Sequence, residues 1–356
     1  MSLAPAPPRP TPSWCVAATM RPAFRAERWH PMPPELRGVV EPAQLLHADG
    51  RWQRPRLSGL WTYLVAILAP SAAFFALVMP GLTAAGIVWL PVLSAALFAM
   101  ATVLMALTSF TEPGIVPAMN QRREDVPPHA VVNGHKVALK YCAVCGIARP
   151  PRASHCRETD RCIEKWDHYC PWVGTAVGRR NHRWFVGFVL ATTCLAALVT
   201  SGSLRHLWGL AAVLEREATL ASPPPPASPM VKVAGLDAAT IAGWPVFARA
   251  AVGAPASCVL LGYCAVVSIL LGMLSAYHLY LIATNQTTYE HVRGAYDTTP
   301  NPFNRGCIGN IGEFLCPACF PPPRCVYEVD SEAGGRSVST ELQAAACSST
   351  GRPPPS

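Results

Sequence analysis

Four long apolar stretches constrain the fold of this chain more than any other feature. A hydrocarbon layer of roughly 30 Å is crossed by a helix of about 20 mostly apolar residues. Hydrophobic residues make up 51% of the chain and charged residues only 14%. The core of a soluble protein could not bury so many apolar side chains. We predict an integral membrane protein, mainly α-helical, with four transmembrane helices. The expected spans are 61–79, 82–107, 184–204 and 256–284, with a tight helical hairpin at Pro80 and Gly81.

Basic residues beside the spans predict which ends face the cytosol. Lys and Arg are frequent in residues 1–60 and 109–182 and sparse between the third and fourth spans. Because short loops rich in basic residues stay on the cytosolic side, we expect both termini and segment 109–182 to be cytosolic. The net charge of +8 then reflects topology and contact with anionic membrane lipids. We expect a multi-pass protein of an endomembrane, such as the Golgi or ER, or of the plasma membrane.

The remaining composition sets the expected order of segments and excludes one class of partner. No basic stripe with interleaved aromatic residues is present, so nucleic acid is not expected as a partner. Proline-rich and small polar stretches predict disordered tails at both ends. The expected segments are a Pro/Arg-rich cytosolic tail at 1–60, two spans within 61–108, a cytosolic cysteine-rich domain at 109–182, two spans with a lumenal loop within 183–284, a cytosolic element at 285–325 and a second tail at 326–356.

Cysteines gather in the segments predicted to face the reducing cytosol. The chain has 14 cysteines, and on this side metal binding or catalysis explains them better than disulfides. Cys142 and Cys145 form a Cys-x-x-Cys pair, whose thiolates can take adjacent corners of a zinc tetrahedron. His155, Cys156 and Cys162 follow within loop reach. We predict a zinc site, and the spacing leaves more candidate ligands than positions.

Residues 141–185 resemble the cysteine-rich domain of the DHHC family of protein S-acyltransferases, the palmitoyltransferases. Their central motif is Asp167-His168-Tyr169-Cys170, a DHYC variant of the family motif, followed by Pro171-Trp172-Val173. Further matching positions are Cys142, Cys145, Arg149, Pro150, Arg152, His155, Cys156, Cys162, Gly178, Asn181 and Phe185. Outside this region the similar elements are Glu112-Pro113-Gly114, Thr287-Thr288-Tyr289-Glu290 and a later segment around Asn310.

The resemblance implies a first zinc ion held by four residues and casts doubt on a second. The implied ligands of the first zinc are Cys142, Cys145, His155 and Cys162. A second zinc of the family would use the positions of Cys156, Thr159, Tyr169 and Ala176, and of these only Cys156 is an ordinary ligand. We therefore predict one structural zinc. We expect Tyr169 to replace the second metal by packing its ring and hydrogen-bonding its hydroxyl, and Cys156 to be a small buried residue, with a reactive thiol as the alternative.

The resemblance also implies the chemistry of Cys170. A thiol attacks a thioester as thiolate, so an adjacent base is needed. His168 can take the proton of Cys170, and Asp167 can orient the imidazole and stabilise its cation. The implied activity moves a palmitoyl or other long-chain acyl group from palmitoyl-CoA to Cys170, and from there to cysteines of membrane-associated proteins. The alternative is a catalytically inactive, membrane-tethered, zinc-binding interaction protein.

Other residues are assigned to substrates by their place beside the motif. The acyl chain gains about 0.8 kcal/mol per buried CH₂, so we expect it among the helices with Cys170 at the cytosolic membrane surface. Trp172 and Phe185 are expected to wall the thioester, and Arg149 and Arg152 to bind the phosphates of CoA; an interfacial aromatic belt and a basic flank are the alternatives. The expected partners are long-chain acyl-CoA, proteins with reactive cysteines at the cytosolic face and membrane lipids, and an accessory subunit is compatible with the sequence.

Two later groups have open roles. Thr287, Thr288 and Asn310 are expected to brace the cytosolic domain against the helix ends rather than touch substrate. Cys316, Cys319 and Cys325 form either a juxtamembrane cluster that becomes acylated, which we favour, or an incidental thiol-rich tail.

Overall fold

The computed structural model describes residues 57–119, 121–123, 129–220, 245–317, 319 and 325–328. Most of the two predicted tails, 1–60 and 326–356, and the predicted lumenal loop over 221–244 lie outside these residues. Helix α1 (Leu57–Thr62) begins before the predicted first span, and strand β10 (Cys325–Glu328) occupies the start of the expected C-terminal tail.

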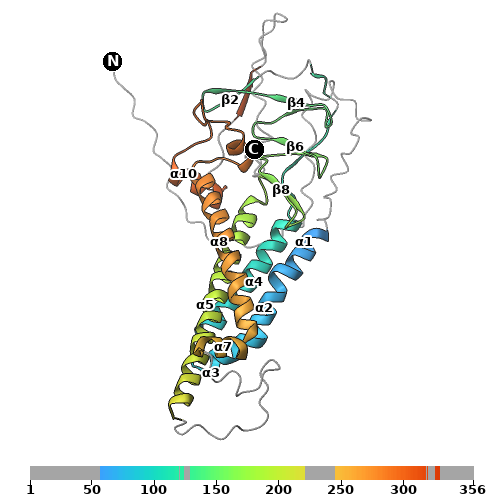
Figure 1. The fold of residues 1–356 in the computed structure, drawn as a ribbon. Coiled ribbons are helices and arrows are strands. Elements are labelled where there is room, and N and C mark those ends of the chain that lie inside the picture. The colour runs from blue at the N-terminus through green and yellow to red at the C-terminus, as the bar shows by residue number, and fades with distance from the viewer. Residues whose placement is uncertain are drawn as a thin grey trace, which may run out of the picture. The chain divides into compact units, whose positions relative to one another are not determined.

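Among the residues that the structure describes, four helices are long and apolar enough to cross a membrane, which agrees with the predicted number of spans. They run over Leu57–Ala84, Trp89–Phe110, His182–Leu220 and Pro255–Ala283. The first consists of α1, η3 (Tyr63–Leu68), α2 (Ala69–Ala73), η4 (Phe74–Val78) and α3 (Met79–Ala84), and the others are α4, α5 and α8. Figure 1 shows these helices side by side, with the short strands beyond one end, here called the strand end.

The turn between the first two helices was predicted at the wrong place. Pro80 and Gly81 continue the helix, because a proline is tolerated in the first turn of α3. The helix ends instead at Gly86, whose φ of 78° suits glycine. The N–H of Ile87 bonds to the carbonyl of Leu82 at 2.9 Å and the N–H of Gly86 to that of Thr83 at 2.9 Å. This is the Schellman pattern of a helix C-terminus.

The helices pack around a buried apolar cluster away from the strand end. Its members are Phe74, Val78, Leu82, Leu90, Leu195, Ala196, Val199, Leu260 and Cys264, drawn from all four spans. Gly202 allows α5 to approach closely, because a Cβ there would lie 2.9 Å from Leu90 and from Phe74. Within lipid such close packing, rather than removal from water, holds helices together. Thr193 and Ser275 add a hydroxyl pair across α5 and α8 at 3.0 Å.

Between α4 and α5 the chain folds into very short antiparallel strands. One sheet has the order β1-β7-β6, from Ile115–Val116, Arg161–Ile163 and Ser154–Cys156. Two hairpins follow, β4 (Lys140–Cys142) with β5 (Ile147–Arg149) and β8 (His168–Cys170) with β9 (Thr175–Val177). The last sheet has the order β10-β2-β3, in which β10 joins the hairpin of β2 (His129–Val132) and β3 (His135–Ala138). Sheets this small need additional crosslinks for stability.

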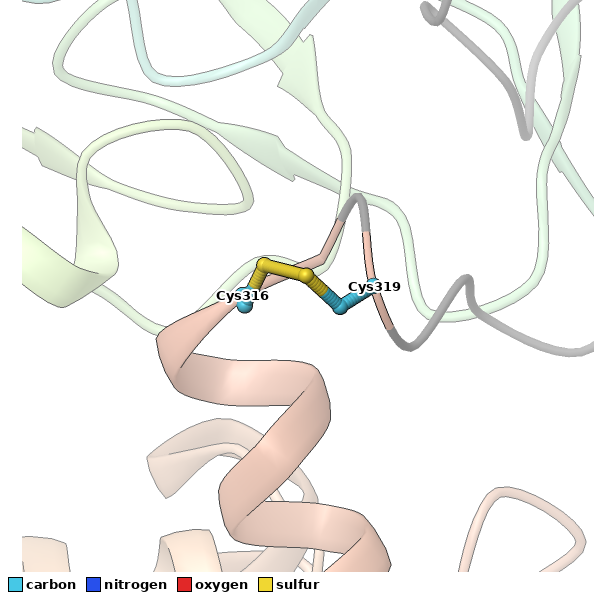
Figure 2. Close-up of a disulfide and its surroundings, with 2 residues drawn as sticks. All are labelled: Cys316 and Cys319. Atoms are coloured by element: carbon cyan, nitrogen blue, oxygen red, sulfur yellow. A yellow bond between two sulfur atoms is a disulfide. The ribbon is translucent and has the colours of Figure 1, made fainter. Parts of the chain in front are cut away.

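The chain after α8 returns to the strand end through short helices. These are α9 (Thr288–Val292) and α10 (Cys307–Leu315). A further short helix, α7 (Val246–Gly253), lies before α8 in the chain. Thr287 and Glu290 form a capping box at the start of α9. A disulfide joins Cys316 and Cys319 directly after α10 (Figure 2). A disulfide was not among the two roles expected for these cysteines, an acylated cluster or an incidental thiol-rich tail, and the two can accept acyl groups only once reduced.

Candidate active site and metal centre

Four residues of three hairpin strands and one turn form a compact set of zinc-type ligands. Cys142 ends β4, Cys145 lies in the β4–β5 turn, and His155 and Cys162 lie opposite each other on β6 and β7. Their ligand atoms all lie within 4.8 Å of one another. The Nδ1 atom of His155 is 3.7 Å from Cys142 Sγ, 3.4 Å from Cys145 Sγ and 4.0 Å from Cys162 Sγ. A zinc tetrahedron with thiolate and imidazole ligands has edges of about 3.5–3.8 Å, so the residues fit one zinc ion.

Side chains pack together around Cys156, one of the four residues at the second implied metal position. Cys156 is 1% exposed and packs with Ile163, Trp166 and Ala176. The ring of Tyr169 borders this cluster, as predicted from the sequence. Burial raises the pKa of the Cys156 thiol, which favours its predicted role as a small apolar residue over a reactive one. A hydrogen bond of the Tyr169 hydroxyl stays a prediction.

The hairpin of β8 and β9 sorts the DHYC motif onto two faces. Successive residues of a strand point to opposite sides, so His168 and Cys170 share one face while Tyr169 faces the other. Tyr169 lies across from Ala176 on β9, and these two positions together border the cluster around Cys156. Because the strand alternates in this way, the tetrapeptide presents His168 and Cys170 on one face and packs Tyr169 against the Cys156 cluster on the other.

Asp167 and His168 form a hydrogen-bonded pair beside Cys170. His168 Nδ1 lies 2.6 Å from Asp167 Oδ2, and Cys170 follows two residues later on the same strand, β8. Burial alone would lower the pKa of His168, but the interactions with Asp167 and Cys170 outweigh it and raise the pKa to about 9. Burial alone would raise the pKa of Asp167, yet the hydrogen bond to His168 and nearby histidines hold that pKa well below its usual range. At neutral pH the pair is therefore an imidazolium beside a carboxylate.

Thr288 completes the surroundings of Asp167. Its backbone N–H donates to Asp167 Oδ1 at 2.8 Å and its hydroxyl to Asp167 Oδ2 at 2.8 Å. These bonds tie the cysteine-rich segment to the chain after α8, as predicted, but nothing in the sequence indicated that Asp167 is the residue held. Thr287 does cap α9, and Asn310 does brace the end of α8 by donating to the carbonyl of Ala283 at 2.7 Å.

The ends of three helices hold the β8–β9 hairpin. Gly59 of α1 lies against the backbone of Val173, where a Cβ would come within 2.7 Å. At the end of α4 the hydroxyl of Ser109 donates to the Val173 carbonyl at 2.9 Å. Asn181, just before α5, donates to the carbonyls of Ala176 and Thr108 at 2.9 and 3.1 Å. Cys170 is thereby fixed at the strand end of the helices, and Asn181 has this role without having been assigned one from the sequence.

The predicted aromatic wall divides into a buried and an exposed part. Phe185 is 3% exposed, and its ring meets His168 edge-on with centroids 5.1 Å apart. Phe185 therefore lies where a thioester at Cys170 would be shielded from water. Trp172 is 62% exposed, which suits an interfacial anchor at a membrane surface. Contact of either side chain with substrate stays a prediction.

Arg152 was predicted to bind coenzyme phosphates, and its position contradicts this. The side chain is only 6% exposed. Its guanidinium donates to both carboxylate oxygens of Glu290 at 2.7 and 2.6 Å and to the side chain and carbonyl of Asn285 at 2.9 and 3.0 Å. It also lies 4.6 Å above the ring of Phe303. Because these partners use most of its donors, Arg152 braces the cysteine-rich segment against the chain after α8.

The other arginines near the site differ in the hydrogen bonds, ion pairs and ring contacts that they make. Arg149 donates to the carbonyl of Tyr141 at 3.3 Å, and its Nε is buried without a hydrogen-bond partner among the described residues. Arg180 pairs with Glu112, and Arg179 with Glu164 at 3.1 Å. Arg183 is exposed and stacks on Trp184, with 4.4 Å from Cζ to the ring centroid. Coenzyme contact by Arg149 stays a prediction.

Comparison with known proteins identifies the region that carries this site. The family model of the DHHC palmitoyltransferases matches residues 135–295. The chain is 34% identical over 234 residues to probable protein S-acyltransferase 5 of Arabidopsis thaliana, an alignment that covers 60% of this chain and 43% of the relative. It is 30% identical over 298 residues to human palmitoyltransferase ZDHHC14, covering 77% and 55%.

A third relative extends the alignment further along the chain. Palmitoyltransferase ZDHHC18-A of Danio rerio is 32% identical over 328 residues, covering 83% of this chain and 63% of the relative. The chain thus spans about half the length of the curated relatives that it matches. Residues 135–295, which hold both the zinc-type ligands and the Asp167-His168-Cys170 group, are therefore a DHHC palmitoyltransferase family domain in a chain that has protein S-acyltransferases among its homologues.

Proposed function

We propose that the protein is a protein S-acyltransferase that uses Cys170 as its nucleophile. The observation that carries this proposal is the hydrogen-bonded pair of Asp167 and His168 beside Cys170 on β8, within a DHHC palmitoyltransferase domain. In the first step the Cys170 thiolate attacks the acyl-CoA carbonyl, and the thioester bond to CoA breaks. The leaving CoA thiolate takes the proton held on His168. The acyl group then forms a thioester with Cys170.

The second step reverses the roles of the sulfur atoms. The thiol of a substrate protein gives its proton to His168 and attacks the acyl-enzyme, and Cys170 leaves as thiolate. Both steps exchange one thioester for another, so the chemistry is nearly balanced in free energy. The protein has only to position and activate the thiols. The DHYC motif serves this reaction as well as a DHHC motif would, because Tyr169 faces away from His168 and Cys170.

The membrane helices give the acyl chain its place. Each buried CH₂ contributes about 0.8 kcal/mol, and a small open recess lined by Pro70, Leu195, Val199 and Val267, among others, separates the first, third and fourth helices away from Cys170. We infer that a long-chain acyl group such as palmitoyl extends among these helices from Cys170. The CoA moiety then remains outside the membrane, with Arg149 as a candidate for its phosphates.

The orientation follows from the charges. The cysteine-rich segment, 109–182, is rich in basic residues, and the positive-inside rule therefore supports a cytosolic position for it and for the strand end of the helices. We infer a multi-pass protein of the Golgi, the ER or the plasma membrane that acts on cytosolic-face proteins with reactive cysteines. One zinc ion at Cys142, Cys145, His155 and Cys162 would crosslink the hairpins that carry the site.

Labelling with a clickable palmitoyl-CoA tests this function. Detergent-solubilised wild type is expected to take up label that hydroxylamine releases, and Cys170→Ser to take up none. Cys194→Ser is the matched control, because Cys194 is an exposed thiol on α5 rather than on the hairpin. Absence of labile label from wild type would instead favour a catalytically inactive zinc-binding interaction protein.

A further inference from the structure

Two histidines outside the Asp167-His168-Cys170 group lie directly beside Asp167. His182 is the first residue of α5, and His278 lies near the strand end of α8. Ligand atoms of Asp167, His182 and His278 all lie within 4.8 Å of one another. The three residues are 2%, 7% and 2% exposed. They come from three separate elements, and none belongs to the zinc-type set around His155.

One nitrogen atom of each histidine in this cluster lacks a hydrogen-bond partner among the described residues. Neither His182 Nε2 nor His278 Nδ1 has a hydrogen-bond partner in the described part of the chain. His182 Nε2 lies 3.9 Å from Asp167 Oδ1, which is too long for a hydrogen bond. Asp167 Oδ1 accepts from the backbone N–H of Thr288, and a carboxylate oxygen has room for a second contact. A buried nitrogen without a partner is unfavourable, so the cluster favours a ligand between Oδ1 and Nε2.

The donor set indicates the class of that ligand. Two imidazoles and one carboxylate suit divalent transition metals, whereas Ca²⁺ and Mg²⁺ prefer oxygen atoms alone. Bonds from zinc to imidazole and carboxylate measure about 2.0–2.2 Å, so a cation fits in the gap of 3.9 Å between the two atoms. We propose that a divalent transition-metal cation such as Zn²⁺ binds at Asp167, His182 and His278 and thereby inhibits acyl transfer.

Inhibition follows from competition for one carboxylate. Asp167 orients His168 through a hydrogen bond of 2.6 Å, and a cation on the other oxygen would draw the negative charge of the carboxylate away from that bond. The ring of His278 packs against Phe185 at 5.2 Å and lies 6.3 Å from that of His168, so a shift of His278 toward the metal would disturb the same rings. This effect rests on the proposed function, whereas metal binding does not.

Cobalt absorption tests the binding directly. The full chain is prepared as Cys170→Ala with its structural zinc in place, so that the reactive thiol cannot serve as a ligand. Added Co²⁺ is expected to bind with one equivalent and to give visible bands without the sulfur-to-cobalt charge-transfer band that the Cys142 site would produce. His278→Gln and His182→Asn, each made in Cys170→Ala, should bind at least tenfold more weakly while keeping the structural zinc.

A matched control is His206→Gln. His206 lies on the same helix as His182 but hydrogen-bonds to Ser257 at 2.8 Å, far along α5. This variant should bind Co²⁺ as the parent does. The proposal is overturned if the parent binds no Co²⁺ through nitrogen and oxygen ligands, which would leave water as the partner of the two nitrogens, or if His278→Gln and His182→Asn bind it unchanged.

The inhibitory effect is measured by single-turnover acylation in Zn²⁺ buffers, with each variant normalised to its own rate without added Zn²⁺. Half-inhibition of His278→Gln should need at least tenfold more free Zn²⁺ than wild type or His206→Gln. Equal midpoints in all three would overturn the inhibitory role. If the parent binds Co²⁺ as described but wild type never becomes acylated, the proposed acyltransferase function fails and the metal site stands.

Discussion

Thr288 donates two hydrogen bonds of 2.8 Å to Asp167, one from its backbone N–H to Oδ1 and one from its hydroxyl to Oδ2. The two residues are 121 positions apart in the chain. Because Asp167 in turn orients His168, the segment after the fourth span controls the geometry beside Cys170. A residue that touches no substrate in the proposed reaction thus acts as a positioning residue.

Removing the hydroxyl of Thr288 tests this control. A hydrogen bond to a charged group contributes about 1.5–3 kcal/mol, so Thr288→Val is expected to slow formation of the acyl-enzyme by about 10- to 100-fold. KM for acyl-CoA should change little. The matched control is Thr284→Val, because the Thr284 hydroxyl bonds only to carbonyls of its own helix at 3.0 and 3.3 Å. Wild-type rates in Thr288→Val would show that the backbone N–H alone suffices.

The pH dependence of acylation reports the state of His168. Its pKa is raised to about 9, above the ordinary value of about 6.5, so the imidazolium persists at neutral pH and is lost as the pH rises through about 9. Acyl-enzyme formation should therefore fall above about pH 9 in wild type. Asp167→Asn removes the carboxylate that supports the cation, and its alkaline limb should move toward pH 6.5. Single-turnover rates across this range make the comparison, and an unmoved limb would contradict the assignment.

Elemental analysis tests the metal content. One zinc per chain is expected, because the position of a second metal is filled by packed side chains around Cys156 and Tyr169. Cys145→Ser should lose the zinc and lower the stability of the domain, whereas Cys156→Ser should retain it. About two zinc ions per chain, or loss of zinc in Cys156→Ser, would contradict the filled second position.

Arg152 is expected to matter for stability rather than for coenzyme binding. Breaking a buried ion pair by removing one partner costs about 3–5 kcal/mol, so Arg152→Met should lower the free energy of unfolding by about that amount, because it leaves Glu290 buried without its partner. Thermal unfolding in detergent measures this effect. Arg183→Met is the control, since Arg183 is exposed and should change stability little. A raised KM for acyl-CoA in Arg152→Met without loss of stability would restore the original assignment.

Composition was sufficient to predict the membrane helices, whereas the choice of the four zinc-type ligands needed the family resemblance as well as their spacing. Four apolar stretches of spanning length leave few other folds, and the resemblance singled out the four ligand residues that the structure brings together. The turn at Gly86 was missed because Pro80 and Gly81 are the stronger local signals, although a proline after a helical segment can begin another one.

The contacts made across the fold could not be predicted from local patterns. Arg152 lies beside a proline in a basic loop, which suggested exposure, and only the packing of Asn285 and Glu290 against it shows its burial. His278 sits inside an apolar span, where nothing in the neighbouring sequence points to Asp167. Such contacts depend on how α8 and the hairpins pack against each other. The local pattern of apolar and polar residues does not reveal that packing.

The central claim is that Cys170 carries the acyl group, and the most direct measurement is intact-protein mass spectrometry after a single turnover with palmitoyl-CoA. The account predicts one hydroxylamine-sensitive palmitoyl adduct, which peptide mapping places on Cys170 and which is absent from Cys170→Ser. An adduct that persists in Cys170→Ser at the wild-type rate, or no adduct on the zinc-loaded wild type, would contradict it.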